Sequence, residues 1–326
     1  MNSSKQEPKS LIMCATPLQM LIAENIIELN SNESFDLLVV ALVDNEKYRN
    51  YFERVKKICA NSLYYVQGSG SLIFFDYIRK LKNNNFYTKY NKYYLASIDS
   101  RHFQYILSRN KNPNIFTFDD GTANIISSSL YYMNSKPKFL KRAVWRVLGV
   151  RYYMEDIKRI SLLHYTIYEN IPNIIENKQY VSLISIVNKE QSEIKDKIIR
   201  FYLGQPLTDI SEFFGIKFVK RNIDKLDIDY YYPHPREISY PKGGFQIIES
   251  SLIFEDYIVQ FLRDNPNANV EVFSFISTAL LNIMSLDRLQ AIYIHDYQIF
   301  KLHHNFYDFA QESFGIPHID LDKESI

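Results

Sequence analysis

The adjacent carboxylates Asp119 and Asp120 are the side chains of this chain best suited to chemistry. They follow the apolar run 114–118 and precede Gly121, a pattern that predicts a strand, a turn and then a helix over 122–126. Parallel sheets bind ligands where their strands end, so one carboxylate can act there as a general base while the other tunes or positions it. The alternative is an ordinary Asp-Gly turn with a helix cap, which is the commoner use of such a pair.

A second candidate is His234, which lies between Pro233 and Pro235 after an expected strand that leads to Tyr232. The prolines stiffen the backbone and stop a helix from forming through the histidine. A rigid imidazole at the edge of a sheet can donate a hydrogen bond to a ligand oxygen, and Arg236 can add positive charge. The alternative is a turn histidine that is packed by its prolines.

Two expected helix starts could bind a nucleotide. Ser277 and Thr278 open a helix after a strand, where free backbone N–H groups and two hydroxyls suit a phosphate. Glu255 and Asp256 lie in the first turn of another helix, where a carboxylate could accept hydrogen bonds from ribose hydroxyls. The alternatives are a plain helix cap for the first pair and dipole-favourable charge for the second.

Motifs of several other chemistries are absent from the sequence. It has no Gly-x-x-x-x-Gly-Lys loop, no glycine-rich dinucleotide fingerprint and no His-Glu-x-x-His or cysteine cluster for zinc. Gly243 and Gly244 precede a strand and are expected in a turn. The spacing of Asp119 and Asp120 is not Asp-x-Asp, so it gives little support for a metal-bridged diphosphate. We therefore expect no metal site.

The composition limits the class of protein. The 326 residues suffice for two domains, and 46% of them are hydrophobic, which is enough for real cores. A net charge of +1 gives no global field for binding nucleic acid. Cys14 and Cys59 form no disulfide framework, which favours a reducing, cytoplasmic location. Residues 1–10 lack the apolar core of a signal peptide, and no segment reaches the length of a membrane span.

Alternating strand and helix patterns predict an α/β fold with parallel sheets covered on both faces. A polar stretch at 188–193 suggests a boundary between two domains, 1–190 and 191–326, that meet at a cleft. Strands are expected at 10–15, 37–43, 93–96, 114–118, 198–203, 245–248, 269–275 and 290–294, and helices at 20–29, 46–60, 101–108, 252–263, 277–284 and 306–313.

Taken together, these motifs resemble those of the bacterial lipooligosaccharide sialyltransferases. The resemblance runs from the first strand nearly to the C-terminus, and its order and spacing are specific as a set. Its marks are Thr16-Pro17-Leu18-Gln19, Leu95-Ala96-Ser97, Phe118-Asp119-Asp120-Gly121-Thr122 with Asn124, His164-Tyr165-Thr166-Ile167, Pro233-His234-Pro235-Arg236, Glu255-Asp256-Tyr257-Ile258 and Asn265-Pro266.

The resemblance implies two Rossmann-like domains of the GT-B type and a homodimer. It also implies inverting transfer of sialic acid from CMP-sialic acid to a galactose hydroxyl of a surface glycan, without metal or cofactor. By position, His234 resembles the family's catalytic histidine, which acts on the departing phosphate. The residues that resemble the nucleotide-binding stretches are Tyr232, Pro233, Pro235, Arg236, Phe254, Glu255, Ser277 and Thr278, and those placed on the acceptor side are Thr16, Gln19, Asp119 and Gly121.

One departure from the family pattern concerns the general base. The family has an aspartate directly after a Gly-x-Pro turn, whereas here the turn 204–206 is followed by Leu207, and Asp209 comes two residues later. Either Asp209 takes the role through a small insertion, or Asp120 is the base. Both alternatives stay open at the level of the sequence.

The chemistry of a CMP-sugar suits these groups. The leaving group is a phosphate monoester, so a histidine and two hydroxyls could stabilise it, whereas a diphosphate would call for stronger neutralisation, often by Mg²⁺. Two other functions are compatible with the sequence. One is another sugar-nucleotide glycosyltransferase, for example one that uses UDP-glucose. The other is a non-catalytic module that binds a nucleotide or a glycan.

The segment 136–151 carries six basic residues and no acid among apolar ones. This pattern is typical of a basic amphipathic helix that lies on an anionic membrane or on a phosphorylated glycolipid. A peripheral position at the inner membrane of a bacterium would follow from it. The alternative is a solvated helix face over the core of the protein.

Overall fold

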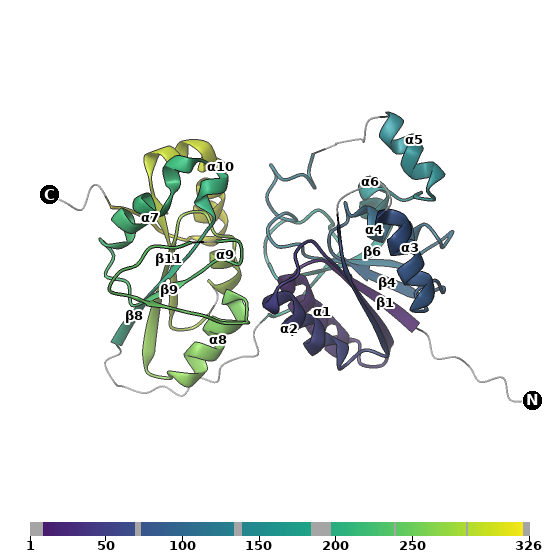
Figure 1. The fold of residues 1–326 in the computed structure, drawn as a ribbon, viewed down its shortest axis with the longest axis horizontal. Helices are drawn as coiled ribbons and strands as arrows, with labels where there is room; N and C mark the ends of the chain where they lie inside the picture. Colours follow the sequence, from purple (N-terminus) through teal and green to yellow (C-terminus); the bar gives the residue numbers. More distant parts are fainter. Residues whose placement is uncertain are drawn as a thin grey trace, which may run out of the picture. The chain divides into compact units, whose positions relative to one another are not determined.

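The chain forms two compact units, Met1–Leu183 and Ile184–Ile326, which Figure 1 colours from purple to teal and from green to yellow. The computed structural model describes residues 9–68, 73–133, 139–183, 197–237, 239–284 and 286–321. The polar stretch 188–193, expected as the domain boundary, lies outside the described residues.

Unit 1 is built on a parallel sheet. Its strands are β1 (Lys9–Cys14), β2 (Ser34–Ala41), β3 (Asn61–Val66), β4 (Lys92–Leu95), β5 (Ile115–Phe118), β6 (Ser161–Thr166) and β7 (Lys178–Tyr180). Within the described residues, these seven strands pair in the order β3-β2-β1-β4-β5-β6-β7, and every pair is parallel. The order makes β1, β4 and β5 neighbours, so the loops that follow them meet at one edge.

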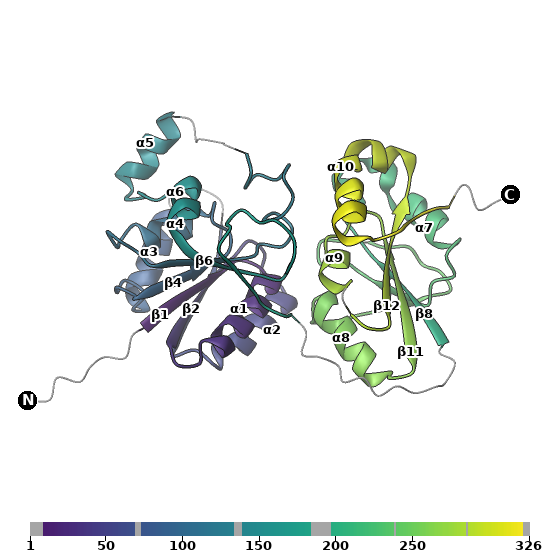
Figure 2. The same ribbon diagram turned by 180° about the vertical axis from the view of Figure 1, so that it is seen from behind.

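Helices cover both faces of this sheet, as Figures 1 and 2 show. They are α1 (Pro17–Leu29), α2 (Glu46–Lys56), α3 (Ile73–Asn83), α4 (Arg101–Leu107), α5 (Phe139–Val147) and α6 (Met154–Ile160). Leu11 and Met13 of β1 join a core with residues of α3, α4 and α6. Ile12 and Cys14 are equally buried but lie on the opposite face, because side chains alternate along a strand.

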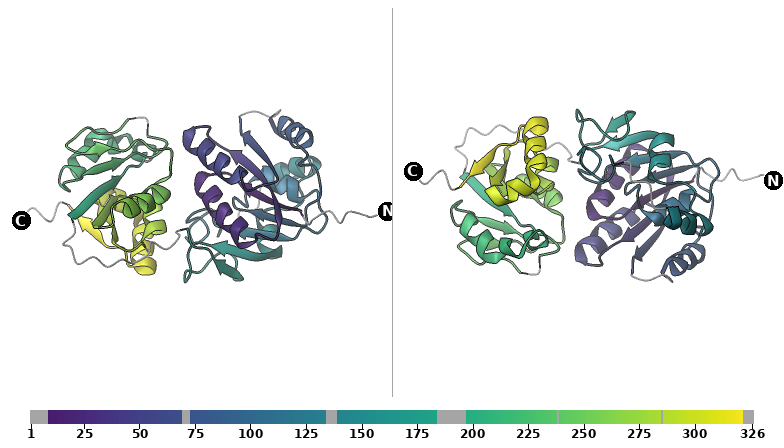
Figure 3. Two further views of the ribbon diagram at one scale, coloured as in Figure 1. Left: turned by 90° about the horizontal axis from the view of Figure 1, so that it is seen from below. Right: turned by 90° about the horizontal axis from the view of Figure 1, so that it is seen from above.

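Unit 2 repeats this architecture, seen from two further sides in Figure 3. Its strands are β8 (Lys197–Leu203), β9 (Tyr230–Tyr232), β10 (Gln246–Ile247), β11 (Ala268–Ser274), β12 (Leu289–His295) and β13 (His318–Asp320). Its helices are α7 (Ile216–Ile223), α8 (Phe254–Asp264), α9 (Ala279–Ile283) and α10 (Tyr297–Phe314), with short 3-10 helices η1 (Leu207–Asp209) and η2 (Glu212–Phe214). Within the described residues, the parallel order is β10-β9-β8-β11-β12-β13, so β9, β8 and β11 are neighbours.

The helix predicted over 122–126 is wrong, because these residues form turns. The Asn124 side chain accepts a hydrogen bond from the backbone of Asp120 at 2.6 Å, and its carbonyl oxygen accepts one from the backbone of Ile174 at 3.2 Å. The backbone and side-chain groups that a helix would order are thus committed to contacts with distant segments, and such local side-chain bonds compete with helix formation.

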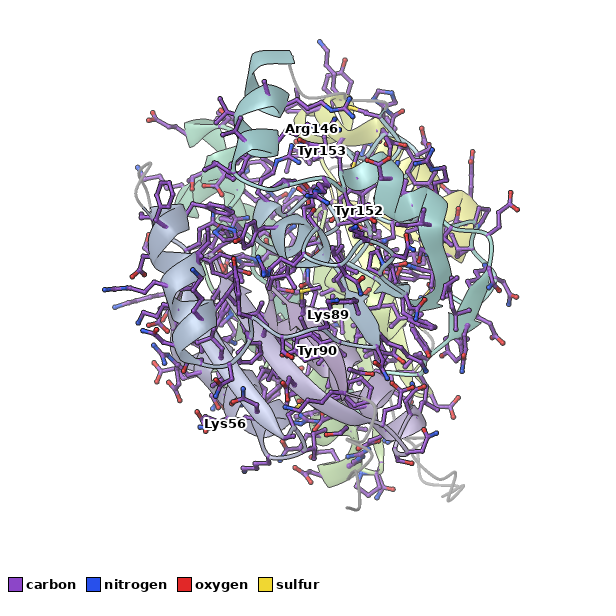
Figure 4. The ribbon with its side chains drawn as sticks, turned by 90° about the vertical axis from the view of Figure 1, so that its right-hand side faces the viewer. Lys56, Lys89, Tyr90, Arg146, Tyr152 and Tyr153 are labelled. Atoms are coloured by element: carbon purple, nitrogen blue, oxygen red, sulfur yellow. The ribbon has the colours of Figure 1, made fainter. Side chains whose placement is uncertain are left out.

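The basic segment 136–151 contains α5, and its residues 136–138 lie outside the described part of the chain. Trp145 is half-buried against the core, whereas 58% of Val144 and 89% of Val147 are exposed. Figure 4 labels Arg146 on this part of unit 1, and Arg146 is also exposed. In the ranges that the structure describes, no helix is both long and apolar enough to cross a bilayer.

Candidate active site

The carboxyl edge of the unit 1 sheet gathers residues from the loops after β1, β4 and β5. The Asp120 carboxylate accepts three hydrogen bonds there. Gln19 Nε2 donates to its Oδ1, while Ser97 Oγ at 3.1 Å and the Tyr131 hydroxyl at 2.6 Å donate to its Oδ2. The first two donors come from motifs that the sequence places far apart. The structure therefore brings three marks of the family resemblance together around one carboxylate.

Burial raises the pKa of the Asp120 carboxyl above its usual value, and the hydrogen bonds from Tyr131, Gln19 and Ser97 oppose this shift. A carboxylate with a raised pKa is a stronger base than an exposed one. General-base catalysis is most efficient when the pKa of the base approaches the working pH. Asp120 thus has the electrostatic surroundings of a base, and its backbone is fixed by the Asn124 side chain at 2.6 Å.

Gln19 and Thr16 hold the start of α1 against this carboxylate. The Gln19 side chain is fully buried, accepts a hydrogen bond from the backbone of Ala15 at 2.6 Å and donates one to Ser97 Oγ at 2.9 Å. The Thr16 hydroxyl accepts a hydrogen bond from the backbone of Gln19 at 3.3 Å and so caps α1, with Pro17 in the first turn. Both residues, predicted on the acceptor side, are used here to position Asp120.

Asp119 differs from its neighbour because its side chain has no exposed surface. Its carboxylate pairs with His164 Nε2 at 2.9 Å and accepts hydrogen bonds from Thr166 Oγ1 at 2.7 Å, the backbone of Ile167 at 2.7 Å and Asn173 Nδ2 at 3.1 Å. Asp119 therefore ties the end of β5 to the end of β6, which is a positioning role. Its place on the acceptor side stays a prediction.

Gly121 permits the turn that carries Asp120 away from β5. Its φ of 60° lies in the left-handed region, where a side chain would strain the backbone. Space is not the constraint, because a Cβ built there meets only Leu18 Cδ2, at 3.8 Å. The glycine is thus required by backbone conformation, as the Asp-Gly pattern predicts.

In unit 2, His234 follows the end of β9, as predicted. Its ring Nδ1 accepts a hydrogen bond from the backbone N–H of Arg236 at 3.1 Å. A neutral imidazole whose Nδ1 accepts must carry its proton on Nε2. The loop therefore presents His234 as an Nε2–H donor, which is the form that suits a developing negative charge on a ligand oxygen.

Arg236 of this loop and Asp209 of η1 pair with each other. Arg236 Nη1 lies 2.8 Å from Asp209 Oδ2, and 62% and 57% of the two side chains are exposed. Asp209, one of the two candidate bases, belongs to η1 in unit 2 and is engaged by a guanidinium in this structure. Solvent-exposed pairs of this kind contribute little to stability, about 0–1 kcal/mol.

The remaining predicted nucleotide-binding residues lie at the end of β9 and just after it, at α8 and at α9. The Tyr232 ring packs on Phe254 with centroids 5.1 Å apart, and both side chains are buried. Glu255 lies in the first turn of α8, as predicted, and accepts a hydrogen bond from Asn282 Nδ2 at 2.8 Å. This bond links α8 to α9.

Thr278 is the N-cap position of α9, and Ser277 precedes it. The Ser277 hydroxyl accepts a hydrogen bond from the backbone of Ala279 at 3.3 Å, and Tyr293 donates to the Ser277 carbonyl oxygen at 2.8 Å. The expected helix start after a strand is present, although α9 spans only five residues. The flanking Pro233 is half-buried and Pro235 is exposed.

Sequence reasoning missed three residues that the structure puts at these edges. Tyr131 donates to Asp120, and its place could not be predicted because the preceding residues 122–126 were expected to form a helix. The Gln205 side chain joins the loop after β8 to the loop after β11 by accepting hydrogen bonds from the backbones of Phe275 and Ile276, at 3.1 and 3.0 Å. The third residue is Glu237, whose carboxylate accepts the backbone N–H of His234 at 2.7 Å.

Among the described residues, no three His, Cys, Asp or Glu side chains lie close enough together to hold a metal ion.

Two solved structures share the whole fold. The glycotransferase of kitacinnamycin gives a TM-score of 0.56 at 9% identity over 97% of this chain and 87% of that one. The S. aureus MnaA–UDP structure gives a TM-score of 0.51 at 13% identity over 94% of this chain and 88% of that one. At such low identity these likenesses show the fold alone. They confirm the predicted fold class, which is α/β with two Rossmann-like domains of the GT-B type.

The profile of glycosyltransferase family 52 matches residues 32–297, and the chain belongs to that family. The CMP-N-acetylneuraminate:beta-galactoside alpha-2,3-sialyltransferase of Pasteurella multocida strain Pm70 is 33% identical over 85% of this chain and 87% of its own length. An N-acetyllactosaminide alpha-2,3-sialyltransferase of Haemophilus influenzae is 32% identical over 87% and 91%, and one of Neisseria meningitidis is 29% identical over 85% and 76%. The predicted class, a glycosyltransferase of the bacterial sialyltransferase type, is confirmed.

The positioning role of Asp119 predicts a large effect on stability. Replacing Asp119 by Ala leaves four donors without their acceptor, and those of His164 and Thr166 are buried. Breaking a buried charged network by removing one partner costs about 3–5 kcal/mol. Urea denaturation of the full chain measures this loss. The matched control is Glu28→Ala, an exposed acid on α1, which should change stability by less than about 0.5 kcal/mol. An unchanged urea midpoint for Asp119→Ala would contradict the role.

Proposed function

We propose that this enzyme transfers sialic acid from CMP-sialic acid to a terminal galactose of a lipooligosaccharide or a similar surface glycan, with inversion at the anomeric carbon. The names of the curated relatives support the donor and the galactoside acceptor. The observation that carries the mechanism is the Asp120 carboxylate, which is held by three side-chain donors and has a raised pKa.

In the proposed reaction, an Asp120 oxygen takes the proton of the acceptor hydroxyl. The acceptor oxygen forms a bond to the anomeric carbon on the face opposite the CMP phosphate, and the bond between that carbon and the phosphate oxygen breaks. The sugar passes through an oxocarbenium-like state, as in glycoside chemistry. CMP leaves with the electron pair, and the Nε2–H of His234 donates to the phosphate oxygen that gains charge.

Asp120 is preferred over Asp209 as the base for an electrostatic reason. Asp209 is 57% exposed, and its carboxylate is already bound by the Arg236 guanidinium at 2.8 Å. Asp120 has no cation among the partners that the structure gives it, and burial raises its pKa. Arg236 is assigned to the nucleotide together with Tyr232, Phe254, Glu255, Ser277 and Thr278.

Substitution of the two proposed catalytic residues tests the mechanism. Asp120→Asn removes the base and His234→Ala removes the phosphate donor, so each should lower kcat by about 10²–10⁴-fold while circular dichroism stays that of the wild type. Asp209→Asn is the matched control and should keep most activity. The assay uses CMP-sialic acid with a panel of galactosides and reads product mass and linkage. Full activity in Asp120→Asn would transfer the role to Asp209.

The donor class predicts a specific ligand response. Saturating CMP should raise the melting temperature, since a ligand at 100 times its Kd adds about 2.7 kcal/mol of stability, whereas UDP at the same concentration should not. Sialyl transfer should continue in EDTA, because we propose that no metal takes part. Stabilisation by UDP would favour a UDP-sugar enzyme instead. CMP binding without donor consumption would favour a non-catalytic module, and loss of turnover that Mg²⁺ restores would overturn metal independence.

Two further partners are proposed for this enzyme, an anionic membrane and a second copy of the chain. We propose that α5 is a peripheral contact to an anionic bilayer, supported by the exposed Val144 and Val147 beside Arg146. A homodimer is proposed from the family resemblance, and light scattering of the purified chain measures it. Together with the membrane contact, we propose a cytoplasmic location at the inner membrane.

Vesicle flotation measures the proposed membrane contact. Arg146→Glu combined with Val147→Asp should lower the fraction bound to vesicles with anionic lipid by about tenfold or more, because each basic residue near such a surface contributes about 1 kcal/mol. Lys57→Glu, an exposed substitution at the end of α2, is the matched control. Equal binding to neutral and anionic vesicles would mean that α5 is only a solvated helix.

A further inference from the structure

The carboxylate of Glu237 joins two loops at the carboxyl edge of unit 2. Its Oε2 accepts the backbone N–H of His234 at 2.7 Å, and its Oε1 accepts the Tyr231 hydroxyl at 2.8 Å. The backbone N–H of Glu237 returns a hydrogen bond to the His234 carbonyl oxygen at 2.9 Å. These bonds close residues 234–237 into a turn, and the bond to Tyr231 ties that turn to β9.

The other loop approaches the same carboxylate through Gly204, directly after β8. A Cβ built on Gly204 would lie 2.2 Å from Glu237 Oε2 and 3.0 Å from Tyr231 Cε1. No side chain fits there unless the carboxylate moves. The glycine of the Gly-Gln-Pro turn therefore allows the Glu237 carboxylate to approach closely, and its φ is not in the left-handed region.

This carboxylate is in turn connected to the loop after β11. Gln205, the residue after Gly204, accepts hydrogen bonds from Ser274 Oγ at 3.0 Å and from the backbones of Phe275 and Ile276. The chain of contacts runs from the His234 turn through Glu237 and the turn after β8 to the segment that precedes Ser277. Three strand ends thus share one hydrogen-bonded frame.

We propose that Glu237 is the positioning residue that holds His234 in place for sialyl transfer. The proposal rests on the proposed function of His234, and it assigns Glu237 no contact with the substrate. The mechanism assigned to Glu237 is geometric: it fixes the backbone on which the imidazole is mounted, while the Arg236 N–H fixes the ring nitrogen that accepts. A catalytic group misplaced by about 1 Å can lose about 10²-fold in rate.

The charge of the Glu237 side chain also depends on pH. Burial raises the pKa of Glu237 to about 7, and hydrogen bonds from the His234 backbone, Tyr231 and the Gln205 backbone oppose the shift. The other titratable groups that face it are the hydroxyls of Tyr202 and Tyr231, and the Tyr202 hydroxyl has no hydrogen-bond partner in the described part of the chain. The Arg236–Asp209 pair lies on the same side of unit 2.

The sign of the linkage follows from the raised pKa. The protonated Glu237 contributes stability that is fully present below about pH 4.5, and this contribution is lost as the pH rises through about 7. Glu237→Gln removes the titration. We therefore compare the melting temperature of Glu237→Gln with that of the wild type at each pH. The difference, variant minus wild type, should be higher at pH 8 than at pH 5 by about 2 °C or more.

The experiment compares Glu237→Gln, Glu237→Ala and Gly204→Ala with the wild type and with Glu312→Gln, an exposed glutamate of α10. We expect Glu237→Ala and Gly204→Ala to lower kcat by about 10²-fold, with little change in cytidine binding, because cytidine has no phosphate for His234 to contact. Glu237→Gln keeps one acceptor oxygen and should recover part of the rate. Glu312→Gln should match the wild type.

Two readouts do not need turnover, so they remain informative if the donor is not CMP-sialic acid. One is the pH dependence of the melting temperature, and the other is the ¹⁵N-histidine spectrum, in which His234 should show the Nε2–H tautomer in the wild type and lose it in Glu237→Ala. Unchanged kcat and an unchanged His234 signal in Glu237→Ala and Gly204→Ala would overturn the proposal. If the variants lost kcat and cytidine binding in parallel, Glu237 would have only a general structural role, and the proposal would also be overturned.

Discussion

The buried and half-buried polar side chains at the strand ends are the constraint on which both units depend. A buried donor or acceptor without a partner costs about 1–3 kcal/mol, so a carboxylate or amide at such a place must be met by several loops at once. Asp119 meets donors from β6 and from the segment that follows it, and Gln205 meets donors from the end of β11 and its loop. Each side chain thereby fixes the spacing of neighbouring strand ends.

The proposed catalytic groups are placed by these buried neighbours. Asp120 follows Asp119 directly, so the donors that hold Asp119 also set where the next carboxylate can lie. His234 is mounted on a turn whose backbone is held by Glu237. In both units the side chain that fixes the backbone is distinct from the side chain proposed to react. Such a division suits catalysis because the reacting group is held in position before the substrate binds.

Those parts of the site that depend on local sequence could be predicted. Prolines around His234 and acids in the first turn of α8 act within a few residues, and near-continuous apolar runs are enough to predict most strands. The parts that depend on strand order could not. Asn124 bonds to Asp120 and to Ile174 and prevents the expected helix, and that pairing exists only after β5 and β6 are neighbours.

Glu237 illustrates the same limit in unit 2. In the sequence it is one more acid after Arg236, and Gly204 is one more turn glycine. Their contact becomes visible only when β8 and β9 pair in parallel, which brings the end of one strand against the loop of the other. A close approach of this kind leaves no local signature, because any glycine in a turn can be explained by turn chemistry alone.

The same packing gives a physical reason for the departure from the family pattern at Leu207. Only 2% of Leu207 is exposed, so a carboxylate at this position would have to be buried, and an ionised group in an apolar site is costly without partners. The nearest following acid, Asp209, is exposed and paired with Arg236. A base must be able to hold a proton as well as to lose one. Asp120, whose carboxyl is buried and has a raised pKa, meets that requirement.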